Sequence, residues 1–161
     1  MKVDPKVVEY LNTVLTNELT AINQYFLHSR MLNHWGVTKL GKHEYQESIE
    51  EMRHADKLVQ RILFMEGVPN VQRLNQVLIG ESAEEILRAD MKLEEKAIAD
   101  LREAIPYCES VRDFASRDLL AGILRDEEHH VDFTETQLDL IGLIGIQNWT
   151  QLNSDPAGGE S

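Results

Sequence analysis

The stretch of sequence that decides the fold is EEMRHAD, residues 50–56. Glu51 and His54 stand one helical turn apart, and Leu58 and Ile62 continue their stripe, a spacing that predicts an amphipathic helix. A carboxylate and an imidazole therefore occupy positions where leucine and isoleucine are normal. Burying a charge on such a stripe is costly unless a partner neutralises it, so this pair calls for a ligand or a counter-charge.

The same Glu-x-x-His pattern recurs in the second half of the chain, at Glu127 and His130. Glu18 precedes Glu51 by the same interval at which Glu94 precedes Glu127. The two halves therefore superimpose at one constant shift, the repeat offset, which places position 18 on position 94. This repeat predicts two helical hairpins related by a pseudo-two-fold axis.

Helix start and stop signals outline four long helices, and no strand-like alternation interrupts them. Residues 146–153 are expected to form a short fifth helix, and residues 154–161 a disordered tail. The first helix is expected to begin at Pro5, after a cap at Asp4, and to end at about Trp35, and the second to extend from a cap at Thr38 to Glu66. The third is expected to begin after a cap at Ser82 and to bend or end near Pro106. The fourth is expected from about Asp113 to Ile144.

The connection between the second and third helices, GVPNVQRLNQVLIGE, is long enough to cross the whole bundle. The other connections are short, so each of the two helix pairs is expected to be antiparallel. The sequence thus predicts one all-α domain over residues 1–153, a four-helix bundle with one long crossover and a short C-terminal helix.

Four glutamates fall near the middle of their predicted helices on apolar stripes, so they should meet at one level of the bundle. Four ionised carboxylates in one slice repel each other, whereas two divalent cations balance them and two imidazoles complete the coordination. Oxygen-rich ligation with a few imidazoles suits Fe(II) or Mn(II). The predicted ligands of this dinuclear metal site are Glu18, Glu51, His54, Glu94, Glu127 and His130.

The composition narrows the classes of function. With 16 basic against 28 acidic residues, the chain is a poor binder of nucleic acid or of an anionic membrane surface. The acidic balance attracts cations, although solubility alone also explains it. A single cysteine, Cys108, leaves no disulfide framework within the chain, and no apolar run is long enough to span a bilayer. We expect a cytoplasmic protein.

Four segments carry a resemblance to a known family: NELTAINQYFLHSR (17–30), ESIEEMRHADKL (47–58), RILFMEGVPN (61–70) and LRDEEHHVDF (124–133). They resemble the bacterioferritins, and the resemblance extends from residue 1 to about residue 152. It implies a ferritin-like fold, ferroxidase chemistry with O2 or H2O2 as oxidant, and iron storage in a hollow homo-oligomeric cage of 24 chains. It also implies haem b shared between two chains and an electron-donor protein for iron release.

The resemblance assigns roles to individual residues. Glu51 and Glu127 would bridge two iron ions, with Glu18 and His54 on one ion and Glu94 and His130 on the other. Met52 would ligate haem b together with its symmetry mate, and the candidate haem-pocket residues are Ile22, Phe26, Tyr45 and Ile49. Periodicity alone favours a different role for Met52, an apolar contact with another helix or subunit.

Neighbouring polar residues have two interpretations each. Tyr25 either donates a hydrogen bond to a ligand carboxylate or is an ordinary core tyrosine. Asp126 is expected to orient a histidine of the other hairpin. Glu44, Glu47 and Glu50 form an acidic patch that either guides cations or is a solvated helix face. Gln46 and Glu50 stand where the family pattern has His and Asp. This difference puts an accessory inner-surface iron site in doubt. The remaining histidines, His28, His34, His43 and His129, are expected to be surface or packing residues.

Three alternatives compete with this interpretation. A haem-free ferritin would differ at Met52. A diiron oxidase or oxygenase would use the same ligands but needs an additional pocket for an organic substrate. A structural helical scaffold would leave the repeated spacing of six polar residues unexplained. The ligand set suits both a stable catalytic centre and an entry site that fills and empties.

Overall fold

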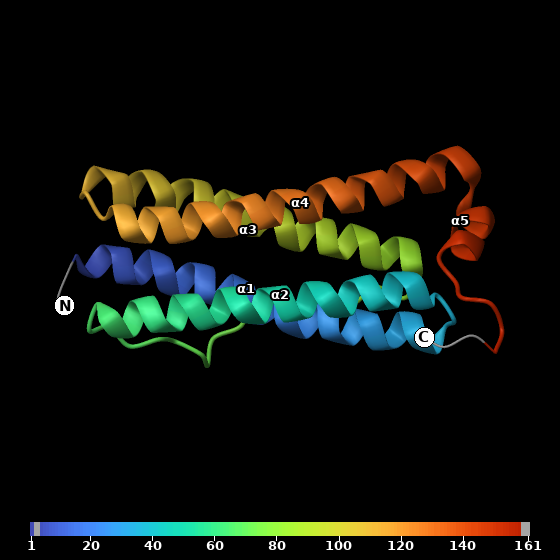
Figure 1. Cartoon of the computed structure of the whole chain (residues 1–161), viewed down its shortest axis with the longest axis horizontal. Coiled ribbons are helices and arrows are strands. Elements are labelled where there is room, and N and C mark those ends of the chain that lie inside the picture. Colours follow the sequence, from blue (N-terminus) through green and yellow to red (C-terminus); the bar gives the residue numbers. More distant parts are fainter. Residues whose placement is uncertain (2–3, 159–161) are drawn as a thin grey trace.

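The computed structural model describes residue 1 and residues 4–158, and all regular secondary structure in these residues is helical. α1 packs against α2 and α3 packs against α4, while α1 also contacts α3 and α2 contacts α4 (Figure 1). The predicted all-α four-helix bundle with a short fifth helix is confirmed. The helices are α1 (Pro5–His34), α2 (Thr38–Phe64), α3 (Ala83–Ser110), α4 (Phe114–Ile144) and α5 (Ile146–Leu152).

Side-chain caps explain where three of the long helices begin. The Asp4 carboxylate accepts a hydrogen bond from the Lys6 amide at 2.8 Å, and the Asp113 carboxylate accepts one from the Ser116 amide at 3.0 Å. The Ser82 hydroxyl accepts from the Glu85 amide at 3.2 Å. These bonds satisfy amide groups that the first turn of a helix leaves without partners.

Three predicted boundaries need correction. Val37, not Thr38, is the N-cap residue of α2, because the Thr38 hydroxyl instead donates to Asp155 at 2.7 Å. α2 ends at Phe64, earlier than expected, and Glu66 has a positive φ of 61°. α3 continues past Pro106 to Ser110, because burial of Cys108 in the core outweighs the lost backbone hydrogen bond.

The long crossover, residues 65–82, lies along α1 and lets α2 and α3 run in the same direction (Figure 1). A row of polar side chains on one face of α1 holds it in place. The contacts are Asn12 with the Val68 carbonyl and the Asn70 amide, Asn17 with the Asn75 side chain, Thr20 with the Asn75 amide, Gln24 with the Leu78 amide, and His28 with the Gly80 amide. Because the row faces the crossover, polar residues are buried on α1 without being part of the apolar core.

Two apolar clusters occupy the two ends of the bundle. One is built around Leu11, Leu58 and Leu101, and the other around Leu32 and Trp149, a residue of α5 that is fully buried. Between them, along all four long helices, lies a layer of buried polar residues. The fold therefore places a polar slice in the middle of an otherwise apolar interior.

Beyond α5, the Asp155 amide donates to the Thr38 hydroxyl at 3.0 Å, so the start of the predicted tail contacts the helical domain. Residues 159–161 of that tail lie outside the described residues. Within the described part of the chain, no helix has the length and apolar character needed to cross a membrane.

Candidate metal centre

The structure brings all six predicted ligands together in the polar slice. Each of the four long helices contributes: α1 and α3 contribute one glutamate each, and α2 and α4 one Glu-x-x-His pair each. All six side chains are buried: Glu18, Glu51, His54, Glu94, Glu127 and His130. Their ligand atoms form two groups, each with all members within 4.8 Å of one another.

The first group surrounds the Nδ1 atom of His54. This nitrogen lies 3.4 Å from Glu18 Oε2, 3.5 Å from Glu51 Oε2 and 3.3 Å from Glu127 Oε1. We call Glu18 and His54 the Glu18 half of the centre.

The second group surrounds the Nδ1 atom of His130. This nitrogen lies 3.5 Å from Glu94 Oε1, 3.2 Å from Glu51 Oε1 and 3.3 Å from Glu127 Oε2. We call Glu94 and His130 the Glu94 half. Glu51 and Glu127 each direct one oxygen to either half, which is the geometry that bridging carboxylates require.

Several of these ligand atoms are buried without any hydrogen-bond partner among the described residues. They are Glu18 Oε1, Glu51 Oε1, Glu94 Oε2, both carboxylate oxygens of Glu127, and His130 Nδ1. Buried polar atoms are normally hydrogen-bonded, so a cluster of exceptions indicates that another group completes them. Carboxylate oxygens and imidazole nitrogens are the donor set that Fe(II) and Mn(II) accept, so the residues fit a pair of such ions.

Protons bound to the histidines and to Glu94 offset part of the negative charge of the buried carboxylates. Burial lowers the pKa of His54, but the adjacent carboxylates of Glu127 and Glu51 outweigh burial and raise this pKa to about 11. The pKa of His130 is raised in the same way, because the adjacent carboxylates of Glu127 and Glu47 outweigh its burial. Burial, followed by the charge of Glu127, raises the pKa of Glu94. Cations entering the centre therefore displace protons.

The outer nitrogens of the two histidines are held crosswise. His54 of α2 faces Asp126 of α4, with 2.7 Å between Nε2 and Oδ2, and His130 of α4 faces Glu50 of α2, with 3.1 Å between Nε2 and Oε2. Glu50 and Asp126 are themselves related by the repeat offset, so the repeat extends beyond the six ligands. Such contacts fix the ring and leave Nδ1 facing the centre.

Tyr25 and Glu47 complete the surroundings of the Glu94 half. The Tyr25 hydroxyl donates to Glu94 Oε1, which is the first of the two interpretations that the sequence left open. Burial, followed by the charges of Glu94 and Asp90, raises the pKa of Tyr25. Glu47 forms an ion pair with His130 Nε2. Burial raises the pKa of Glu47, but hydrogen bonds from His130 and His43 outweigh burial and leave it lowered.

The structure decides between the alternatives that the sequence left open for two neighbouring groups. Glu44 and Glu47 do not form a solvated face with Glu50, because both are buried. His28 is a fully buried packing residue rather than a surface residue, and its Nδ1 atom lies 3.0 Å from Asp90 Oδ1. Sequence reasoning missed Asp90 entirely, although it lies one turn before Glu94 on the same stripe of α3 and could have been found there.

Comparisons with known proteins agree with this geometry. Residues 8–144 match the family described as a ferritin-like domain. The chain is 51% identical to the bacterioferritin of Brucella melitensis, over 98% of both chains. It is 47% identical to those of Rhodobacter capsulatus and Streptomyces coelicolor, over 97% and 98% of both chains respectively. The chain belongs to the bacterioferritin family. Membership supports a function in iron storage.

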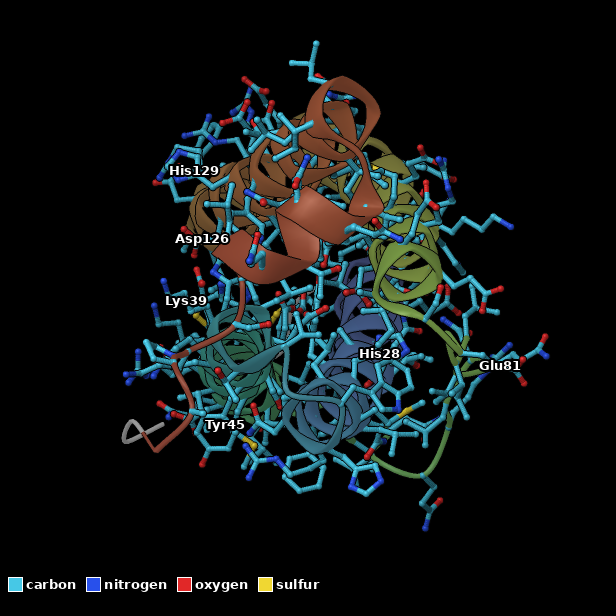
Figure 2. The ribbon with its side chains drawn as sticks, turned by 90° about the vertical axis from the view of Figure 1, so that its right-hand side faces the viewer. His28, Lys39, Tyr45, Glu81, Asp126 and His129 are labelled. Carbon is cyan, nitrogen blue, oxygen red and sulfur yellow. The ribbon has the colours of Figure 1, made fainter. Side chains whose placement is uncertain are left out.

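An apolar surface on the α1–α2 hairpin contains the residue that the bacterioferritin resemblance assigns to haem. Met52 is 59% exposed, Phe26 50% and Tyr45 37%, while Ile22 and Ile49 are half-buried. The Arg30 guanidinium lies over the rings of Phe26 and Tyr45. Figure 2 shows Tyr45 at the outer surface of the bundle. A free thioether among exposed apolar side chains fits an axial ligand of a haem shared across a subunit interface.

Proposed function

We propose that this chain oxidises Fe(II) to Fe(III) at the six-residue centre and that the ferric product is stored as mineral inside a cage of 24 identical chains. One observation carries the proposal: two buried ligand groups share Glu51 and Glu127 and contain no other common residue. This arrangement binds two substrate ions close together, so that a two-electron oxidant, O2 or H2O2, can take one electron from each.

The protein residues act by binding and orienting the two Fe(II) ions. Glu18 and His54 hold one ion and Glu94 and His130 hold the other, while Glu51 and Glu127 bridge them. The four carboxylates balance the four positive charges of two Fe(II) ions, which removes the cost of burying them. Asp126 and Glu50 keep the two imidazole rings in position from outside.

The surroundings of the centre favour Fe(II) over an organic substrate. The hollow outside His54, with a volume of about 310 Å³, has four charged side chains in its lining, Lys57, Asp118, Arg125 and Asp126, beside Leu119, Gly122 and Ile123. Pockets for organic molecules are lined mainly by apolar and aromatic side chains. A polar, charged hollow suits the passage of ions.

The exposed surface around Met52 supports a haem-containing member of the family rather than a haem-free ferritin. Met52 and its symmetry mate would hold haem b between two chains, with Ile22, Phe26, Tyr45 and Ile49 around it. Haem supplies one-electron transfer when bound, which would serve release of the stored iron with electrons from a donor protein. Both the cage and a cytoplasmic location belong to this proposal.

Aerobic Fe(II) oxidation, followed by the absorbance of the ferric product, tests the proposal. The rate should fall to that of Fe(II) in buffer in Glu18→Ala and His130→Ala, whereas Glu95→Ala, an exposed neighbour of Glu94, should retain the parental rate. Size-exclusion chromatography with light scattering should give the mass of 24 chains for all three variants. A parental rate in His130→Ala, or a monomeric parental chain, would refute the proposal.

A further inference from the structure

The pseudo-two-fold symmetry of the six ligands does not extend to the residues behind them. Next to the Glu94 half, five polar side chains are buried where the repeat offset places apolar residues next to the Glu18 half. The five pairs are Tyr25 and Leu101, His28 and Ala104, Glu44 and Leu120, Glu47 and Ile123, and Asp90 and Val14. All five apolar members belong to the apolar cluster around Leu11. The Glu18 half of the centre therefore packs against the apolar core, and the Glu94 half against a network of polar side chains.

Backbone amides of the crossover fix where the protons lie in this network. The Gly80 amide donates to His28 Nε2 at 3.0 Å, so the proton of the neutral ring is on Nδ1, which faces Asp90 Oδ1 at 3.0 Å. A side chain at Gly80 would collide with the Ile86 backbone, since an added Cβ would lie 2.4 Å from its nitrogen. Figure 2 shows His28 on the side of the bundle that faces the crossover, away from Asp126.

A second backbone amide of the crossover orients Gln24 so that it, too, donates a hydrogen bond to Asp90. The Leu78 amide donates to Gln24 Oε1 at 3.0 Å, which leaves the Gln24 side-chain amide to donate to Asp90 Oδ1 at 3.0 Å. Asp90 Oδ1 thus accepts from both Gln24 and His28. Both hydrogen bonds use Asp90 Oδ1 as the acceptor, so this oxygen carries no proton.

Glu44 is then the carboxyl group of this cluster that carries a proton. It is 1% exposed, one of its carboxylate oxygens lies within 4.8 Å of a carboxylate oxygen of Asp90, and its Oε1 atom has no hydrogen-bond partner among the described residues. Burial, followed by the charge of Asp90, raises the pKa of Glu44. His28 cannot serve as a metal ligand here, because Nδ1 carries the proton and Nε2 accepts from Gly80. The cluster of His28, Glu44 and Asp90 is therefore better suited to holding a proton than to binding a third metal ion.

A small cavity connects this cluster to the metal centre. Its volume is about 10 Å³, and its lining includes Glu44 and Asp90 as well as Tyr25, Glu47 and His130, together with the apolar Leu87 and Phe133. That volume is room for about one water molecule, and the lining offers the polar partners that a buried water needs.

We propose that Glu44 and Asp90 form a buried proton donor that serves the Glu94 half of the centre through one water in this cavity. The inference rests on the proposed ferroxidase function. When two Fe(II) ions give one electron each to O2, the product H2O2 requires two new O–H bonds and hence two protons. Glu44 supplies one of them: its O–H bond breaks as it protonates the cavity water, and that water passes a proton to the reduced oxygen. Hydrolysis of the two Fe(III) ions releases the second proton and the proton that Glu44 regains. No comparable donor backs the Glu18 half among the described residues, so the two halves are inequivalent.

Infrared spectroscopy of the chain without added metal tests where the proton is. The parental protein at neutral pH should show a carbonyl stretching band of a buried carboxylic acid that disappears in Glu44→Gln and persists in the control Glu95→Gln. Glutamine keeps the shape and can still donate to Asp90, so the bundle should stay intact. If the spectra of parent and Glu44→Gln show the same acid bands, Glu44 is ionised and the proposal fails.

Iron oxidation then tests whether the proton is used. Glu44→Gln should bind two Co(II) per chain, as the parent does, yet oxidise Fe(II) about ten-fold more slowly at neutral pH, with a loss that shrinks as the pH falls. The groups that also titrate around Glu44 are Tyr25 and His28 on α1, His43 and Glu47 on α2, Asp90 and Glu94 on α3, and His130 on α4. An unchanged rate and pH profile with two bound Co(II) would overturn the relay and leave the ferroxidase proposal standing. If Glu44→Gln loses Co(II) binding, the same measurement is made with Asp90→Asn. A parental rate and pH profile in Asp90→Asn would also refute the proton donor.

Discussion

The Nδ1 atom of His130 lies 3.2 Å from the Oε1 atom of Glu51, although the two residues belong to different helical hairpins and lie far apart in the sequence. The contact shows that the centre exists only where the α1–α2 hairpin meets the α3–α4 hairpin. Each hairpin alone offers half of the ligands. Formation of the centre and docking of the hairpins are thus the same event, and metal binding should stabilise the docked bundle.

Bridging and terminal ligands should differ in how many ions they affect. Glu51→Ala removes a carboxylate that faces both histidines, whereas Glu18→Ala removes one that faces His54 alone. We expect two bound Co(II) per parental chain, about one tight ion in Glu18→Ala, and none in Glu51→Ala, by spectroscopic titration. Glu95→Ala is the matched control. Equal losses in both variants would contradict the bridging assignment.

The stability of the metal-free chain should fall as the pH rises. The pKa of His54 is raised from 6.5 to about 11 in the folded chain, so its stabilising charge is complete below about pH 6.5 and is lost toward pH 11. The raised pKa of Glu94 acts in the same direction, because the unfolded chain releases that proton from about pH 4.5 upward while the folded chain retains it.

Denaturant unfolding at about pH 6 and about pH 9 measures this effect, with the lower pH giving the larger free energy of unfolding. Saturating Co(II) should flatten the trend, since the ions replace the protons. A metal-free chain that gains stability toward pH 9 would show that the buried protons have been placed wrongly.

The Asp126 carboxylate should matter through the orientation of His54. Asp126→Asn keeps the shape but removes the charge that faces Nε2 at 2.7 Å, so metal affinity should drop about 10- to 100-fold. Competition with a chelator measures the affinity, and Glu128→Gln, an exposed neighbour, is the control. Restored affinity in Asp126→Glu would separate orientation from a purely structural role. An unaltered affinity in Asp126→Asn would exclude the orienting role.

Met52 should be needed for haem and dispensable for the bundle. Met52→Leu keeps an apolar side chain on the exposed surface but removes the thioether, so the haem absorption bands should disappear while the assembled mass and the Fe(II) oxidation rate persist. Met91→Leu on α3 is the control. Retention of haem in Met52→Leu would assign the ligand to another residue.

The repeat in the sequence was sufficient to predict the bundle and the meeting of the six ligands. Helix periodicity fixes which residues share a stripe, and the constant repeat offset makes both hairpins present the same stripe at the same level. Glu18, Glu51, His54, Glu94, Glu127 and His130 could therefore be named from spacing, without knowledge of any contact. The start of α1 at Pro5 and the end of α4 at Ile144 follow local signals for the same reason.

Only the tertiary structure decided what surrounds those ligands. His28 has no local feature that distinguishes it from a surface residue, because the crossover that contacts it is irregular and its path depends on side chains of α1 far away in the sequence. Glu44 of α2 is buried beside side chains of α1, α3 and α4, which its own helix does not specify. Pro106 likewise remains inside α3 because packing against other helices outweighs a local signal. Periodicity acts through neighbours in the chain, whereas burial and the pairing of His28 with Asp90 arise from segments that meet only on folding.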